Sequence, residues 1–241
     1  MIDKHAQSSP RVEQVATRVR SQLKQNTHHH VLDVNGLSID RRGLRLVDHL
    51  SFVLKPGQVL GVSGPSGSGK TTLLRCLTGL TTDYAGMIRL PSHRLGMVFQ
   101  EPRLLPWRTV RANVMLPLKQ PDALFRAEEW LERVQLDDVM DMYPAQLSGG
   151  MCQRVAIARA LAAEPDVLFV DEPFSALDRP LALQLRDRLY ALIQSRQLTT
   201  IWVSHDTDEL EHIATHRLAL HGPPGTWSLS PAQAKSNSQP N

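Results

Sequence analysis

A glycine-rich segment carries the residues with the clearest chemistry in this 241-residue sequence. It reads Gly64, Pro65, Ser66, Gly67, Ser68, Gly69, Lys70 and Thr71, which fits the pattern G-x-x-x-x-G-K-[ST]. Glycines let backbone N–H groups approach phosphate oxygens, Lys70 supplies a full positive charge, and the hydroxyl of Thr71 is suited to ligate Mg²⁺. Together with Thr72, the segment predicts a phosphate-binding loop. The alternative is a glycine turn without a ligand.

Two adjacent carboxylates end an apolar run further along the chain. Residues 167–170 read Val-Leu-Phe-Val, as a buried strand does, and Asp171 and Glu172 come next. A phosphate-binding loop needs a carboxylate at the end of another strand to hold its metal. We therefore assign Asp171 to Mg²⁺, through water, and Glu172 as the base that orients and polarises the attacking water. The alternative is an acidic pair that ends a strand for solubility.

A second candidate anion site lies at residues 147–154, which read Leu-Ser-Gly-Gly-Met-Cys-Gln-Arg. Ser148 followed by Gly149 and Gly150 at a helix start can bind an anion through backbone N–H groups. Between a phosphate-binding loop and an acidic pair, this segment resembles the signature of the ATP-binding cassette (ABC) ATPases. The resemblance covers about residues 31–220. It implies a P-loop NTPase core with a parallel sheet, an antiparallel β subdomain near the N-terminus and an inserted helical subdomain.

The same resemblance implies roles for further residues. Gln100 matches the glutamine that contacts Mg²⁺ and water, and His205 matches the histidine that contacts the γ-phosphate. In the family two such domains pair head to tail, so one signature closes on the ATP that the other subunit holds. The residues that would do so here are Ser148, Gly149, Gly150 and Gln153. ATP and Mg²⁺ are the implied cofactors, and a second ATPase subunit, in a homodimer, is an implied partner.

Residues 99–110, Phe-Gln-Glu-Pro-Arg-Leu-Leu-Pro-Trp-Arg-Thr-Val, look like a segment of bacterial importers of nitrate, taurine and aliphatic sulfonates. The likeness implies an ATPase subunit on the cytoplasmic face of the cell membrane. Its partners would be transmembrane permease subunits and, indirectly, a periplasmic or extracellular solute-binding protein. Leu104–Trp107 would form a groove for the permease, or pack the core of the insert, or both. Another solute, a soluble ABC ATPase of DNA repair or translation, and a non-catalytic regulatory binder remain alternatives.

Three features depart from the family pattern. Arg41 stands where most cassette ATPases carry an aromatic residue that stacks on adenine. We assign Arg41 to the base, because a guanidinium plane can also stack, but the preference for ATP over GTP stays open. Cys152 stands in the signature where relatives often carry a basic residue, and residues 81–99 are shorter than usual, which indicates a trimmed edge hairpin.

Apolar runs and helical periodicity indicate the elements that position these residues. We expect strands at residues 59–62, 96–99, 167–170 and 199–203, and helices at residues 70–80, 123–134, 155–163 and 181–192. Buried strands that alternate with helices predict a parallel α/β core.

The predicted ATPase domain spans residues 31–221, with a helical insert at about 101–160. Residues 1–30 are a polar extension in which Val12, Val15 and Val19 recur at helical spacing, and residues 222–241 predict a flexible tail.

Composition narrows the partners. The formal net charge is only +3, which favours a solvated surface over a nucleic-acid partner. The two cysteines, Cys76 and Cys152, have no metal-ligand spacing and favour a reducing cytoplasm. No apolar run approaches the roughly 20 residues that cross a bilayer, so we expect work at a membrane to require a partner.

Overall fold

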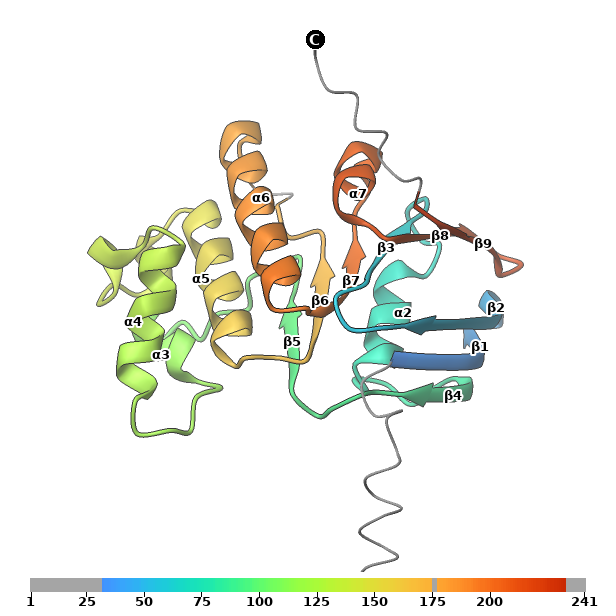
Figure 1. Ribbon diagram of the computed structural model, residues 1–241, viewed down its shortest axis with the longest axis horizontal. Helices are drawn as coiled ribbons and strands as arrows, with labels where there is room; N and C mark the ends of the chain where they lie inside the picture. The colour runs from blue at the N-terminus through green and yellow to red at the C-terminus, as the bar shows by residue number, and fades with distance from the viewer. Residues whose placement is uncertain (1–31, 175–176, 233–241) are drawn as a thin grey trace, which may run out of the picture. The chain divides into compact units, whose positions relative to one another are not determined.

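The computed structural model describes residues 32–174 and 177–232, and its strands form two sheets (Figure 1). The smaller sheet has three antiparallel strands in the order β2–β1–β4, and the larger has six strands in the order β5–β6–β7–β3–β8–β9. Within the larger sheet only β9 runs antiparallel to its neighbour. The predicted parallel core and the predicted antiparallel subdomain near the N-terminus are both confirmed.

The strands of the smaller sheet are β1 (Leu32–Arg41), β2 (Leu44–Leu54) and β4 (Ala85–Arg89). Those of the larger sheet are β3 (Val59–Ser63), β5 (Leu95–Val98), β6 (Val167–Asp171), β7 (Thr199–Val203), β8 (His216–Gly222) and β9 (Thr226–Pro231). The α-helices are α2 (Lys70–Leu77), α3 (Val110–Met115), α4 (Ala123–Arg133), α5 (Gly149–Ala162), α6 (Arg179–Ser195) and α7 (Thr207–Ile213). Two short 3₁₀ turns, η1 (Asp137–Val139) and η2 (Pro144–Gln146), complete the described elements.

The central strands are apolar throughout because both of their faces are covered. In β6, Val167 and Phe169 belong to one hydrophobic cluster, whereas Leu168 and Val170 belong to the other. Side chains along a strand alternate between its two faces, so the same four-residue run supplies two separate cores. Each core then needs its own layer of covering elements.

Helix α2 lies between the two sheets (Figure 1). Leu73, Leu74 and Leu77 on α2 are fully buried in a cluster with β1 and β2 on one side and the larger sheet on the other. The other face of the larger sheet packs against α5, α6, α7 and the helical insert. Because its apolar stripe is held from both sides, α2 begins at a fixed position next to the end of β3.

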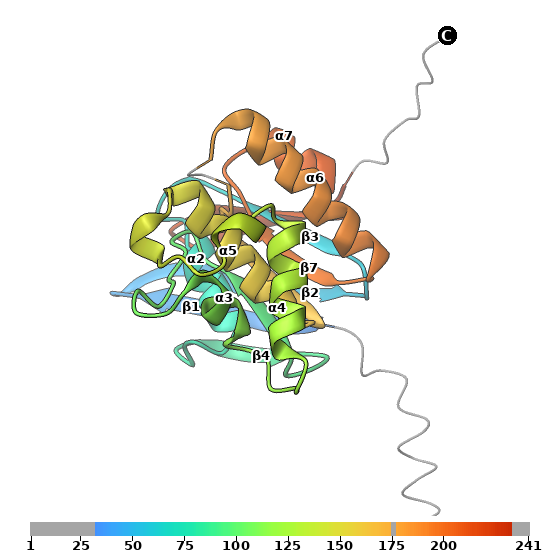
Figure 2. The ribbon, with the colours of Figure 1, turned by 90° about the vertical axis from the view of Figure 1, so that its left-hand side faces the viewer.

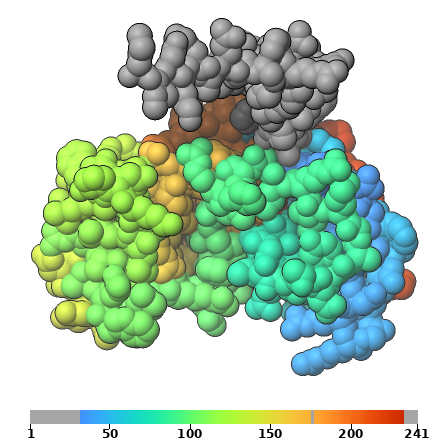
Figure 3. Space-filling view, turned by 90° about the horizontal axis from the view of Figure 1, so that it is seen from below, coloured from blue at the N-terminus to red at the C-terminus, as the bar shows by residue number. Residues whose placement is uncertain are grey.

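The helical insert contains α3 and α4, and both pack against α5 (Figure 2). Figure 3 shows the surface of this region, in green to yellow-green, on the side opposite the blue surface of β1 and β2. Asn113 on α3 is completely buried, where its side chain bonds to Leu105 and to the carbonyls of Arg108 and Thr109. It therefore fixes the irregular chain that enters α3. The mainly helical character predicted here is confirmed.

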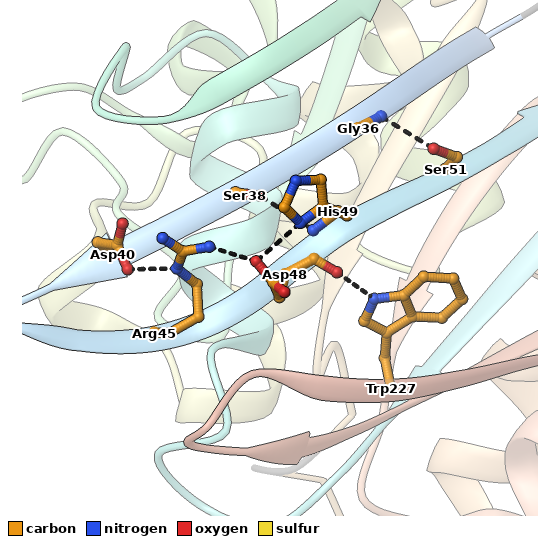
Figure 4. Close-up of polar contacts among 8 residues, drawn as sticks. All are labelled: Gly36, Ser38, Asp40, Arg45, Asp48, His49, Ser51 and Trp227. Atoms are coloured by element: carbon orange, nitrogen blue, oxygen red, sulfur yellow. Dashed lines mark hydrogen bonds and ion pairs between the residues drawn. The ribbon is translucent and has the colours of Figure 1, made fainter.

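Several boundaries differ from the expectations. Helix α5 begins at Gly149 rather than at residue 155, because the Ser148 hydroxyl accepts a hydrogen bond from the Met151 N–H and caps it. The flexible tail predicted from residue 222 is wrong for residues 226–231, which form β9. There Trp227 and Leu229 alternate inward and pack on the core, and the Trp227 indole donates to the Asp48 carbonyl at 2.7 Å (Figure 4).

Some predictions fall outside the described residues. These are the polar extension of residues 1–30 and the helical spacing of its valines. Within the described ranges, no helix is both long enough and apolar enough to cross a bilayer.

Candidate active site

The phosphate-binding loop predicted at residues 64–71 connects β3 to α2. Gly64 has φ 145°, and a Cβ at this position would lie 2.3 Å from the Leu220 carbonyl oxygen, so only glycine fits the close passage of the loop against β8. The Lys70 ammonium reaches back across the loop and donates to the carbonyls of Gly64 at 2.8 Å and Pro65 at 3.0 Å. The loop therefore surrounds the Lys70 ammonium, the group that would bind a phosphate.

The start of α2 is open to a ligand. Its N-cap residue, Gly69, has φ 103° and no side chain to cap the first N–H groups of the helix. The Ser68 hydroxyl is buried and has no hydrogen-bond partner among the described residues. Uncapped N–H groups, an orphaned hydroxyl and an ammonium together form a site that fits a phosphate anion. These donors match the triphosphate of a nucleotide.

Asp171 lies at the end of β6, where the chain meets the start of α2. The Thr71 hydroxyl donates to its Oδ2 at 3.1 Å. Burial raises the pKa of the Asp171 carboxyl above its ordinary value, while the hydrogen bond from Thr71 and the charge of Lys70 act in the opposite direction. A buried carboxylate beside a hydroxyl is an oxygen donor set of the kind that Mg²⁺ prefers. Thr71 and Asp171 thus fit the predicted metal site.

Glu172 stands between the two other residues predicted from the resemblance. Its Oε2 lies 3.4 Å from Gln100 Nε2 and 3.3 Å from His205 Nδ1. The backbone places it there: Glu172 has φ 46°, a conformation rare for a non-glycine residue, and its N–H donates to the Val203 carbonyl at 3.0 Å. Because β5, β6 and β7 are parallel neighbours, their carboxyl ends bring the three side chains to one edge.

Most of the phosphate-binding loop shares one cleft of about 760 Å³ with Gln100, Glu172 and His205, whereas Asp171 is not among the residues that line it. The described residues that line it are Arg41, Arg42, Leu44, Leu46, Gly64, Pro65, Ser66, Gly67, Gly69, Lys70, Thr71, Thr72, Gln100, Glu172 and His205. The structure therefore brings together nearly all of the predicted phosphate-loop residues with Glu172, Gln100 and His205. Arg42, Leu44 and Leu46 were not predicted to line a site; the run Arg-Arg-Gly at residues 41–43, which indicates a tight hairpin, was the available signal.

The predicted signature residues lie elsewhere. Ser148, Gly149 and Gly150 at the start of α5 are not among the described residues that line the cleft. Ser148 and Gly149 are exposed, and a Cβ added at Gly149 would meet no atom within 4 Å. At Gly150 a Cβ would come within 2.7 Å of Leu177 Cδ2, so glycine lets this turn approach the segment after Glu172. Within one chain the signature faces outward.

The structure also places Gln153 away from the cleft. Its side chain is buried and donates through Nε2 to the Phe99 carbonyl at 3.1 Å. Arg159, which lies further along α5, donates to the carbonyls of Pro102 and Arg103 at 2.8 Å and 2.9 Å. These contacts tie α5 to the chain around Gln100. A buried amide is poorly placed to contact a nucleotide. The sequence did not predict that Gln153 instead links α5 to the chain at Phe99.

Comparisons with known proteins agree with this geometry. The family model described as ABC transporter matches residues 47–175. The chain belongs to this family. It is 40% identical over 191 residues to the aliphatic sulfonates import ATP-binding protein SsuB of Bacillus cereus, with 76% of each chain covered. It is 41% identical over 198 residues to SsuB 1 of Pseudomonas aeruginosa, covering 75% of this chain and 78% of that one.

Solved structures lead to the same family. A dimeric, post-hydrolysis structure of the ATP-binding cassette MJ0796 with ADP and Pi superposes with a TM-score of 0.76 at 26% identity, covering 84% of this chain and 99% of that one. An inward-facing metal-chelate type ABC transporter superposes with a TM-score of 0.73 at 26% identity, covering 84% of this chain and 83% of that one. The resemblance drawn from the motifs is therefore confirmed, and the chain is an ABC ATPase that binds ATP.

Proposed function

We propose that this chain is the ATP-hydrolysing subunit of an importer that takes up organic sulfonates. The observation that carries the ATPase assignment is the position of Glu172, flanked by Gln100 and His205 in the cleft that also holds the phosphate-binding loop. The solute class rests on the names of the relatives that cover three quarters of the chain. Another solute of the same importer group is the second candidate.

The phosphate end of the cleft would hold ATP. Lys70 and the open N-terminus of α2 would bind the outer phosphates, exchanging the two carbonyl contacts of the ammonium for phosphate oxygens. Thr71, Asp171 and Gln100 would hold Mg²⁺, with Asp171 acting through water. When bound, this ion would neutralise charge that develops on the phosphates.

Glu172 would orient and polarise the attacking water. Its side chain is largely shielded, with 18% exposed, whereas the side chain of His205 beside it is 69% exposed. In this arrangement Glu172 accepts a proton from water, and His205 and Gln100 contact the γ-phosphate side of the site. A non-catalytic binder would not need such a carboxylate, so the geometry favours hydrolysis.

A second copy of the chain would complete the site. Ser148 and Gly149 are exposed, Gly150 is half-exposed, and the Ser148 hydroxyl caps the N–H of Met151 in the first turn of α5. In a head-to-tail dimer they would close on the ATP held by the phosphate-binding loop of the other subunit. The dimeric cassette that this chain resembles supports such a pairing.

The permease would dock on the chain between Gln100 and α3. Leu104 packs against the core of the insert, while Trp107 is 71% exposed, which is compatible with both roles considered for this patch. Through this contact the chain would sit at the cytoplasmic face of the membrane, and closure on ATP would move the permease. A solute-binding protein would act from the other side.

Purification with its membrane subunits tests the proposal. We expect the chain to copurify with hydrophobic partner subunits and its ATP hydrolysis to rise several-fold when the loaded solute-binding protein is added with an alkanesulfonate or taurine. Nitrate and a metal chelate serve as comparison solutes. Stimulation by nucleic acid in the absence of any membrane subunit would contradict the importer assignment. Stimulation by nitrate alone would leave the ATPase in place and replace the solute.

A further inference from the structure

One side of the cleft is built by the hairpin between β1 and β2. Arg41, Arg42 and Leu44 on this hairpin line the cleft together with Leu46. The Arg41 guanidinium donates to the Thr72 hydroxyl at 3.3 Å, on the first turn of α2. The hairpin tip therefore lies beside the phosphate-binding loop, within reach of a nucleotide that this loop would hold.

The hairpin has little freedom. Arg41 pairs with Leu44 across a two-residue loop. The loop residues, Arg42 and Gly43, have φ 52° and 76°, as a type I′ turn requires. Such a turn matches the twist of the strands on either side, so the backbone of both arginines is positioned by the sheet.

Arg41 and Arg42 differ from Arg45 in their charge pairing, and Figure 4 shows the two partners of Arg45. Arg45, one residue past the turn, is held by the carboxylates of Asp40, at 2.6 Å, and Asp48. Neither Arg41 nor Arg42 has an ion-pair partner within residues 32–174 and 177–232. Two guanidinium groups thus keep their planes and most of their N–H donors available to a ligand.

The side chains of the hairpin suit a base with acceptor atoms. No Phe, Tyr or Trp lines the described cleft, so stacking on the base would come from a guanidinium plane and from the half-exposed Leu44. Guanine presents two adjacent acceptors, O6 and N7, which match the paired donors of an arginine. Adenine presents an N6 amino donor beside N7, which leaves one arginine donor facing another donor.

We propose that Arg41 and Arg42 read the base of the nucleotide, and that the chain binds GTP at least as tightly as ATP. The proposal rests on the nucleotide-hydrolysing function above and extends it to base specificity. It separates two possible roles of the arginines: reading a purine edge, or only adding positive charge near the triphosphate.

Competition binding on the full-length chain tests the order of affinities. A fluorescent ATP analogue is displaced with ATP, GTP and ITP; ITP has O6 and N7 but lacks the 2-amino group of guanine. We expect GTP and ITP to displace the probe at concentrations no higher than ATP does. Displacement by ATP at a lower concentration than GTP would overturn the proposal.

Lysine substitutions test the mechanism, because lysine keeps the charge and loses the planar donor pair. Arg41→Lys and Arg42→Lys should each weaken GTP binding about tenfold and ATP binding less, while leaving the affinity for inorganic triphosphate unchanged. Arg89→Lys on β4, where the side chain is 67% exposed and lies outside the cleft, is the matched control. Unchanged GTP affinity in both cleft variants would show that the arginines act only as charges, and would also overturn the proposal.

The two proposals fail separately. A chain that binds GTP as tightly as ATP but whose hydrolysis does not respond to a sulfonate would refute the importer assignment alone. A sulfonate-stimulated ATPase that selects ATP over GTP would refute the base-reading role alone.

Discussion

Two helix N-termini among the described residues carry glycines, and they differ in how far the surrounding chain encloses them. The start of α2 has a left-handed glycine, Gly69, and no side-chain cap, and it lies in a cleft with Lys70. The start of α5 is capped by Ser148, is exposed and is not among the described residues that line this cleft. Both offer backbone N–H groups to an anion. Only α2 surrounds that anion with walls from its own chain.

The difference implies a division of work between the two termini. An enclosed terminus with an ammonium can bind phosphate by itself. An exposed terminus has too few partners for tight binding and needs a surface brought to it. We therefore expect α2 to determine nucleotide affinity and α5 to determine hydrolysis, and the following changes test that separation.

Lys70→Ala tests the enclosed terminus and should have the largest effect. Loss of a charged donor should weaken nucleotide binding by about 100-fold, because the phosphates would keep only neutral donors. Titration of a fluorescent ATP analogue into the purified chain measures it. Lys55→Ala, at an exposed position between β2 and β3, is the control. An affinity within about threefold of the parent would show that α2 does not determine binding.

Gly149→Ala tests the exposed terminus. Since an added Cβ meets no atom within 4 Å, the fold and nucleotide binding by one chain should be unchanged. Hydrolysis should fall about tenfold, because the methyl group would block close approach to the phosphates held by a second copy. Steady-state ATPase assays and thermal melting measure the two effects.

Gly150→Ala serves as the contrast, since its Cβ would come within 2.7 Å of Leu177. This variant should lose thermal stability as well as activity. If Gly149→Ala hydrolyses ATP at the parent rate, the exposed terminus has no part in the reaction.

Gln153→Leu sharpens the comparison within α5. The substitution removes the bond to the Phe99 carbonyl, so the free energy of unfolding should fall by about 1–2 kcal/mol. Nucleotide affinity should stay the same, because Gln153 is buried away from the cleft. Chemical denaturation and nucleotide titration give the two values. Weaker nucleotide binding without loss of stability would restore Gln153 as a direct ligand.

The smallest effect is expected at a third helix N-terminus, that of α7, where a change at Glu209 should shift the melting temperature slightly. Asp206 caps α7, so a carboxylate occupies the position where an anion would bind. On this helix burial raises the pKa of Glu209 above its ordinary value of 4.5; nearby Asp206 raises it further, whereas a hydrogen bond from Ser204 and the charge of Arg186 lower it.

A raised pKa means that the folded state favours neutral Glu209. Its contribution to stability is therefore complete below pH 4.5 and is lost as the pH rises through the folded-state pKa. Glu209→Gln should remove this loss and raise the melting temperature relative to the parent at pH 8 by about 2 °C, with less gain at pH 4. An equal change at both pH values would contradict the buried ionisation.

Much of the phosphate end of the site follows from the sequence. The loop at residues 64–71, the carboxylates after 167–170 and the histidine after 199–203 each end an apolar run, and parallel strands align such ends at one edge. The burial of Gln153 could not be predicted from the local sequence pattern. Its partner, Phe99, is 54 residues away along the chain, and only the packing of α5 brings the two together.

The same limit explains the error at the C-terminal end. Residues 222–225 are rich in glycine and proline and predict a flexible tail, yet they form the turn before β9. Trp227 then bonds to Asp48, which is 179 residues away. Because its partner is so distant, β9 is indicated in the sequence only by a short alternation of apolar and polar residues.

Mixing two inactive variants tests most directly the claim that each site is shared between copies. Lys70→Ala disables the enclosed terminus, and Ser148→Asp keeps a capping side chain while placing a negative charge at the exposed one. In a head-to-tail heterodimer one site carries both defects and the other carries none. The account predicts that the mixture hydrolyses ATP at about a quarter of the parent rate although each variant alone is inactive, since half of the dimers would have one intact site of two. No recovery, in a mixture shown to contain heterodimers, would contradict it.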